Sequence, residues 1–184
     1  MAVAARDLSQ LAPVPRTSAR SERALVREAA RGSEQAMSEL FRLTWPGAYR
    51  AAFLIVHDHA AAEDTAQDAL VAAIKNLDRF DRRRPLQPWL HRIVVNRAID
   101  WARLRKLRSE VFAEVDRGAD APASLDPVLA ALATLAPDQR AVVVLRHLLE
   151  YTPGEIARML GLPRGTVNSR LRRALDSLET ELER

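Results

Sequence analysis

Residues 152–178 read TPGEIARMLGLPRGTVNSRLRRALDSL, and their pattern predicts a helix, a tight turn and a second helix. Thr152, followed by Pro153 and Glu155, is typical of a capped helix start, because the Thr and Glu side chains can satisfy each other's free backbone amides. Gly161 can adopt the left-handed backbone conformation that ends such a helix. The stretch is therefore predicted to be a helix-turn-helix.

The second helix of this motif is predicted to be amphipathic. Its expected buried stripe consists of Val167, Leu171, Ala174, Leu175 and Leu178. A polar, cationic helix face fits the DNA major groove, where Arg pairs with guanine and Asn with adenine while neighbouring side chains hold phosphates. The predicted DNA-contacting residues here are Arg164, Thr166, Asn168, Ser169, Arg170, Arg172 and Arg173. A solvated face of a helical hairpin is the alternative, but residues 164–173 hold four Arg and no acid, which favours DNA.

A second basic segment precedes this motif. Residues 79–108 contain ten Lys or Arg against two acids, so this segment carries a charge of +8 while the whole chain of 184 residues carries only +4. Its mixture of cations, an amide and aromatic rings suits phosphate contact, base hydrogen bonding and stacking of unpaired bases. The candidate residues are Arg82, Arg83, Arg84, Gln87, Trp89, Arg92, Asn96, Arg97, Arg103 and Arg105. The alternative is a solvated Arg face with the Trp side chains in the core.

Composition limits the other function classes. Ala and Leu dominate while aromatic residues make up only 5% of the chain, which favours an all-α fold. The chain has no cysteine, so disulfides, thiolate metal sites and a redox switch carried by the chain itself are excluded. Neither a long apolar run nor a signal core is found, and we expect a soluble, cytoplasmic protein without membrane insertion. The only metal or catalytic candidates are His57, Asp58 and His59, which are better explained as a polar helix junction; no metal, cofactor, small-molecule substrate or enzymatic activity is expected.

The chain is predicted to contain two helical domains. Residues 1–20 are predicted to form a disordered tail, residues 21–108 a first domain, residues 109–125 an acidic linker and residues 126–184 the helix-turn-helix domain. In the first domain we expect a helix from Ser21, a second capped by Ser33, a third around Tyr49, a fourth over 60–77 and a fifth after a polar break at 81–88. The fourth helix presents one polar, acidic face, formed by Glu63, Asp64, Gln67 and Asp68.

The residues of both domains resemble a known family. GLPRGTVNSRLRRAL, together with LAPDQRAVVVLRHLLEYTPGEIARML before it, looks like region 4 of an extracytoplasmic-function, or group IV, sigma factor. AEDTAQDALVAAIKNLDRF and PWLHRIVVNRAIDWARLRK look like region 2 of the same family. The resemblance covers residues 22–108 and 126–184 and implies two small helical domains, which bind the −10 and −35 promoter elements respectively.

The resemblance also implies roles and partners. The Glu63 to Asp68 face corresponds to the surface that grips the β′ clamp helices of core RNA polymerase, and region 4 implies contact with the β flap. The Arg82–Gln87 loop occupies the position of the −10 specificity loop, and Asn96 matches the Asn near the flipped −10 base. An anti-sigma factor is an expected partner. The alternatives are a helix-turn-helix regulator that works without polymerase and a sigma-like decoy that titrates an anti-sigma factor.

Overall fold

The computed structural model describes residues 19–111 and 127–182, and within these residues it contains helices and turns but no strand. The all-α prediction is confirmed. The helices are α1 (Ala19–Ala29), α2 (Glu34–Val56), α3 (His59–Lys75), the short η2 (Leu77–Arg79), α4 (Leu86–Val111), α5 (Pro127–Thr134), α6 (Pro137–Val143), α7 (Pro153–Leu160) and α8 (Arg164–Leu182). Apart from residues 19 and 20 in α1 and 109–111 in α4, the predicted tail and linker lie outside the described residues.

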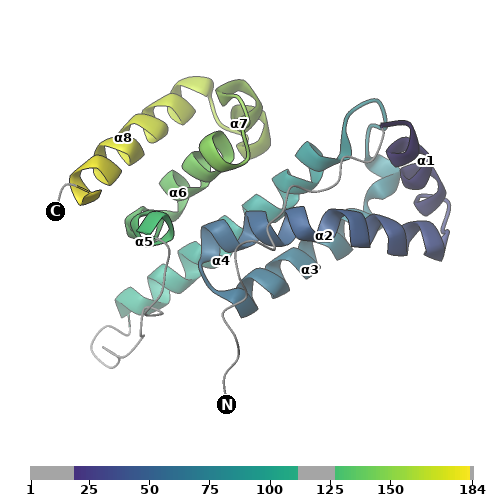
Figure 1. The fold of residues 1–184 in the computed structure, drawn as a ribbon, viewed down its shortest axis with the longest axis horizontal. Helices are drawn as coiled ribbons and strands as arrows, with labels where there is room; N and C mark the ends of the chain where they lie inside the picture. The colour runs from purple at the N-terminus through teal and green to yellow at the C-terminus, as the bar shows by residue number, and fades with distance from the viewer. Residues whose placement is uncertain (1–18, 112–126, 183–184) are drawn as a thin grey trace, which may run out of the picture.

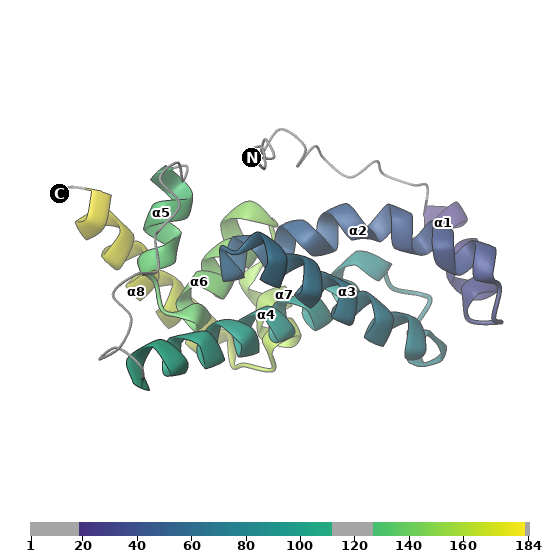
Figure 2. The same cartoon turned by 90° about the horizontal axis from the view of Figure 1, so that it is seen from below.

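Helices α2, α3 and α4 pack together as a bundle, with α1 against one end of α2 (Figure 1). Helices α5 to α8 form a second group, which packs on α4 and on the end of α2 (Figure 2). One continuous apolar cluster joins the groups, because Ile55 and Val94 of the bundle belong to the same buried cluster as Leu145 and Ile156. The two predicted domains are therefore in direct contact in this structure.

Helix α2 corrects the prediction of two separate segments around residues 33–43 and 49–56. It begins at Glu34 with a Ser33 cap and continues through Pro46 to Val56. A proline inside a helix removes one backbone hydrogen bond, and here a row of aromatic side chains spaced four residues apart continues across it. The stacked rings are Phe41, Trp45, Tyr49 and Phe53, with His59 of α3 at the end of the row. Packing along this row outweighs the local preference to end the helix at the proline.

The junctions on either side of α3 and before α4 determine where the polar residues lie. His57 ends α2 in the left-handed conformation with φ of 54°, and the Asp58 carboxylate caps α3 by accepting from the Ala61 N–H at 3.0 Å. Helix α4 begins at Leu86, so the predicted break at 81–88 is shorter than expected. The Leu86 N–H donates to the Glu22 carboxylate at 3.1 Å, which gives α4 a starting cap supplied by α1.

The second group follows the predicted pattern with one local change. After α6 the chain widens into a π turn over Val144–Leu148, with the Leu149 N–H donating to the Val144 carbonyl at 2.9 Å. Helices α7 and α8 then form the predicted pair, and both pack against neighbouring helices of this group. Among the described helices, none has an apolar stretch long enough to cross a membrane.

Candidate nucleic-acid interface

The turn between α7 and α8 has the predicted geometry. The Glu155 N–H donates to the Thr152 hydroxyl at 3.3 Å, and the Thr152 N–H donates to the Glu155 carboxylate at 2.8 Å, which completes the capping box. These hydrogen bonds from Thr152 lower the pKa of Glu155. Gly161 ends α7 in the left-handed conformation with φ of 66°, and the next N–H, of Leu162, returns to the Ala157 carbonyl. Helix α8 is thereby held at a fixed angle to α7.

Helix α8 exposes most of the side chains predicted to contact DNA. Its inner side is formed by Val167 and Ala174, which are fully buried. The exposed members of the predicted set are Arg164, Asn168, Arg172 and Arg173, while Thr166, Ser169 and Arg170 are half-buried. Leu175 corrects the predicted stripe, because it is 39% exposed. Its position lies about 100° around the helix from Ala174, at the edge of the buried face.

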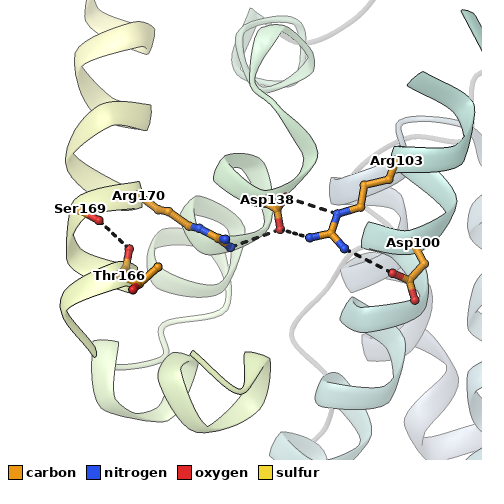
Figure 3. Close-up of polar contacts among 6 residues, drawn as sticks. All are labelled: Asp100, Arg103, Asp138, Thr166, Ser169 and Arg170. Atoms are coloured by element: carbon orange, nitrogen blue, oxygen red, sulfur yellow. Dashed lines mark hydrogen bonds and ion pairs between the residues drawn. The ribbon is translucent and has the colours of Figure 1, made fainter. Parts of the chain in front are cut away.

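Arg170 differs from the other arginines of α8, because its guanidinium is already bound within the molecule. Its Nη1 donates to Oδ1 of Asp138 in α6 at 3.2 Å (Figure 3). The same carboxylate accepts from Arg103 of α4, from Nη2 at 2.6 Å and from Nε at 3.3 Å. Two predicted DNA-contacting residues from different domains thus share one acid.

The predicted DNA-contacting side chains in the basic segment of the first domain lie on different sides of α4. Trp89, Arg92 and Asn96 are three and four residues apart on α4 and therefore share one side of the helix. Arg92 is exposed and Asn96 is half-exposed. Arg105 is nine residues from Asn96, which places it about 180° away, where it donates to Asp58 at 3.3 Å and lies 5.2 Å above the Trp101 ring. The structure does not bring Arg105 to the Asn96 surface.

Trp89 is part of the protein interior more than of its surface. Its ring is half-buried and lies 4.9 Å from the Phe80 ring, tilted by 43°. It also lines a small, almost wholly apolar pocket with Phe41, Ile74 and Leu90 between α2, α3 and α4. The surroundings of Trp89 therefore fit the alternative prediction, in which its side chain packs in the core.

The loop before α4 exposes its arginines. Arg82, Arg83 and Arg84 are all exposed, and Asp81 organises the loop by accepting from the Arg83 N–H at 3.1 Å. Arg84 lies 3.5 Å from the same carboxylate. Gln87, predicted at the end of this loop, is an exposed residue in the first turn of α4. The loop and the start of α4 thus present side chains on the same end of the bundle.

The acidic face of α3 is present as predicted. Glu63, Asp64, Gln67 and Asp68 are exposed, while the opposite face of α3, including Ala66 and Leu70, is buried in the bundle. The Asp68 carboxylate lies 3.7 Å from the Arg97 guanidinium of α4. Because both side chains are exposed, this contact contributes little stability. It nevertheless joins the acidic face of α3 to the basic surface of α4.

Sequence reasoning missed the polar residues between the two groups. Arg140, which is 9% exposed, donates from Nη1 to the Ile55 carbonyl at the end of α2 and from its other nitrogens to three carbonyls in and just after the last turn of α5. Burial lowers the pKa of Arg140 to about 10, so the guanidinium stays charged at neutral pH. The Tyr151 hydroxyl lies 2.9 Å from Nδ1 of His91, and burial lowers the pKa of His91 to about 4. Only the long-range fold reveals the pairing of His91 with Tyr151 and of Arg140 with the Ile55 carbonyl, since these partners are 60 or more residues apart.

His57, Asp58 and His59 form the α2–α3 junction and are occupied structurally. The His57 ring contacts the Leu54 carbonyl at 2.9 Å, and burial lowers the pKa of His57 to about 4. The His59 ring lies 2.6 Å from the Tyr49 hydroxyl. Across residues 19–111 and 127–182, no three His, Asp or Glu side chains are grouped closely enough to hold a metal ion.

Comparison with known proteins agrees with both halves of the chain. Residues 40–109 match the family model described as Sigma-70 region 2, and residues 125–178 match Sigma-70 region 4. The chain is 35% identical to an RNA polymerase sigma-E factor of Streptomyces avermitilis, covering 84% of this chain and 89% of that relative. It is also 35% identical to the ECF RNA polymerase sigma factor SigM of Mycobacterium tuberculosis, covering 84% and 81%.

Two solved structures are similar in fold. CnrH, solved in complex with the cytosolic domain of CnrY, superposes with a TM-score of 0.66 at 29% identity, covering 89% of this chain and 97% of that one. RpoE of Bartonella quintana, solved with the anti-sigma factor NepR, gives a TM-score of 0.63 at 27% identity, covering 79% and 96%. The family matches, the relatives and the two helical surfaces agree, and the chain therefore belongs to the sigma-70 family of RNA polymerase sigma factors, within its ECF group.

Proposed function

We propose that this sigma factor binds core RNA polymerase and directs initiation at promoters whose −35 and −10 elements are contacted by α8 and α4 respectively. The observation that carries the proposal is that each matched sigma region exposes a cationic helix surface within one chain. The roles it assigns are binding roles, so we do not expect enzymatic activity. Its site of action is with polymerase in the cytoplasm.

Contact with the −35 element is assigned to the outer side of α8. Ser169 lies near the middle of this side, with Arg172 and Arg173 flanking it, and the buried Val167 fixes the helix beneath them. Arg can bond a guanine bidentately in the major groove, whereas Ser holds a phosphate or a base edge. This arrangement supports reading of one face of the duplex by the first three turns of α8.

Contact with the −10 element is assigned to the loop at 81–85 and the outer side of α4. The exposed Arg82, Arg83 and Arg84 suit phosphates, and Asn96 supplies an amide that can donate to and accept from an unpaired base. Because Trp89 packs on Phe80, we assign it to supporting this surface. Opening the duplex requires a few kcal/mol for each unstacked base, which polymerase and this basic surface must together offset.

Polymerase docking is assigned to the exposed acidic face of α3. The four side chains lie on one side of a helix whose other side is held by the bundle, so the surface is rigid. We also propose control by an anti-sigma factor, because the similar RpoE of Bartonella quintana was solved in complex with one. An anti-sigma factor would act by covering one of these surfaces.

Run-off transcription tests the proposal, with purified core polymerase, the full chain and a promoter fragment library. The expected result is RNA from a subset of fragments only when the chain is present. A regulator that works without polymerase would bind fragments but start no RNA, and a decoy would do neither. Absence of initiation from any fragment would refute the proposal.

The docking face is tested separately by pull-down of core polymerase. Asp64→Arg with Asp68→Arg is expected to abolish the pull-down, while Glu39→Arg with Asp78→Arg, which reverses two exposed acids elsewhere on the bundle, is expected to preserve it. Asp64→Arg alone leaves the Asp68 contact with Arg97 in place. If the first double variant still supports transcription, polymerase docks elsewhere.

A further inference from the structure

Asp138 is the residue at which the two predicted DNA surfaces meet. Its Oδ1 accepts from Arg103 Nη2 at 2.6 Å and from Arg170 Nη1 at 3.2 Å (Figure 3). Because both nitrogens contact the same oxygen, they lie within about 6 Å of each other. Arg103 comes from the −10 surface of α4 and Arg170 from the −35 helix α8, so one carboxylate holds a member of each surface.

The surroundings of Asp138 make this contact specific. Its side chain is 30% exposed and that of Arg170 is 27% exposed, so the bridge is partly shielded from water. Arg103 also lies 3.7 Å from Asp100, its neighbour on the same helix, but that pair does not cross between domains. The bridge is accompanied by the Arg140 bond to the Ile55 carbonyl and by the contact of Tyr151 with His91.

This closed arrangement is incompatible with binding both promoter elements at once. The −35 and −10 elements are centred about 25 base pairs apart, which is roughly 85 Å along B-form DNA. Two guanidiniums held within about 6 Å of each other cannot contact elements at that separation. The bridge must therefore break before both surfaces engage one promoter.

We propose that Asp138 is an intramolecular stand-in for promoter phosphate, which adds to the contacts that hold the free sigma factor closed and is replaced by DNA phosphates at Arg103 and Arg170 when the molecule opens. A carboxylate and a phosphate both offer anionic oxygens to Arg in the same bidentate geometry. The half-exposed Arg103 leaves N–H groups through which a phosphate can begin the exchange. The inference rests on the proposed function for the identity of the competing anion, but the closed state itself is measurable without DNA.

The bridge changes apparent DNA affinity through the population of the open state. A protein that binds only when open has an affinity proportional to its open fraction. Removing the Asp138 charge takes away its attraction for two cations and should raise the ratio of open to closed molecules by about three- to tenfold. The DNA concentration that opens half of the molecules should fall by the same factor.

Single-molecule fluorescence energy transfer on the full chain measures this directly. Because the chain has no cysteine, dyes can be attached through Ser38→Cys on α2 and Glu179→Cys on α8, both of which are exposed positions. The variants compared are Asp138→Asn and Asp100→Asn. Asp100→Asn is the matched control, because it also removes one negative charge beside Arg103 yet breaks no interdomain contact. A circular dichroism melt of each variant verifies that it folds.

The expected result is a three- to tenfold lower opening midpoint with promoter DNA for Asp138→Asn, and an unchanged midpoint for Asp100→Asn. Equal midpoints for the two variants would overturn the inference, and so would dyes that stay close while saturating DNA is bound. Failure of the proposed function is distinguished by the run-off assay, which measures initiation and does not depend on the closed state. If Asp138→Asn, but not Asp100→Asn, raises the fraction of open molecules in the absence of DNA, the bridge is supported even if the run-off assay shows no initiation.

Discussion

Replacing Arg140 by Met should destabilise the protein more than replacing an exposed arginine. The guanidinium donates to four backbone carbonyls, at Leu132, Ala133, Leu135 and Ile55, over distances of 2.5 to 3.0 Å. Leu132 and Ala133 belong to the last turn of α5, Leu135 follows that helix directly, and Ile55 belongs to the end of α2. Met keeps an unbranched apolar stem that reaches about as far as Nε but has no donor, so it leaves these carbonyls without that partner.

The magnitude follows from the number of hydrogen bonds lost. A buried carbonyl that loses its partner costs roughly 1 kcal/mol or more, so four carbonyls suggest about 4 kcal/mol. Removing a buried charge recovers part of that cost, and the expected loss of unfolding free energy is about 3 kcal/mol. For a chain of this size, each kcal/mol lowers Tm by about 2–4 °C, so we expect Tm to fall by about 6–12 °C.

The assay is thermal unfolding followed by circular dichroism at 222 nm, with urea unfolding as a second measurement. Arg146→Met is the control, because Arg146 is exposed and, within the described part of the chain, donates a single hydrogen bond, to the Tyr151 carbonyl at 3.4 Å. Its Tm should change by less than about 2 °C. Arg140→Lys keeps the charge but cannot reach all four carbonyls at once, so it should recover only part of the loss. Equal Tm values for Arg140→Met and Arg146→Met would refute the reasoning.

Three further outcomes are expected. Arg173→Ala should weaken binding to the cognate −35 element by about 1–3 kcal/mol if Arg173 reads a base; equal weakening on all sequences, measured by fluorescence anisotropy, would make it a phosphate contact. Gly161→Ala should cost about 1 kcal/mol of unfolding free energy in a urea titration, because φ is 66° and no neighbouring atom lies near the added Cβ. The His91 pKa of about 4 lies below its usual value of 6.5, so the unfolded chain binds the extra proton first and stability should fall by about 3 kcal/mol as the pH drops from about 6.5 to about 4. His91→Gln should lack that part of the pH dependence, and an unchanged pH profile would count against the assignment.

Local sequence patterns were sufficient to predict the helix-turn-helix and the exposed acidic face of α3. Thr152, Glu155 and Gly161 act on backbone groups within four residues of themselves, so their effect can be predicted without the rest of the fold. Leu175 was predicted to be buried but is exposed, because it lies at the edge of the apolar stripe of α8, where burial depends on the neighbouring helices. The two segments predicted around residues 33–43 and 49–56 form one helix, because aromatic packing continues across Pro46 and outweighs its local effect.

The contacts between the two groups were beyond sequence reasoning. Asp138 and Arg140 lie in the first turn of α6, and nothing near them in the chain indicates Arg103 or the Ile55 carbonyl as partners. Glu22 likewise caps α4 from 64 positions away. Polar groups that join separate elements become identifiable only when the fold brings them together.

The position of Arg140 also has a consequence for how the molecule melts. The Arg140 guanidinium binds free carbonyls at helix ends in both halves of the chain. One buried apolar cluster, with members from Ala48 to Ala174, also includes residues of both halves. Unfolding of either half would expose the apolar surface of the other to water and leave carbonyls at a helix end without a donor. Neither half is therefore expected to stay folded when the other unfolds. The free protein should therefore absorb heat in one cooperative transition, with calorimetric and van't Hoff enthalpies that agree, although two family regions are present.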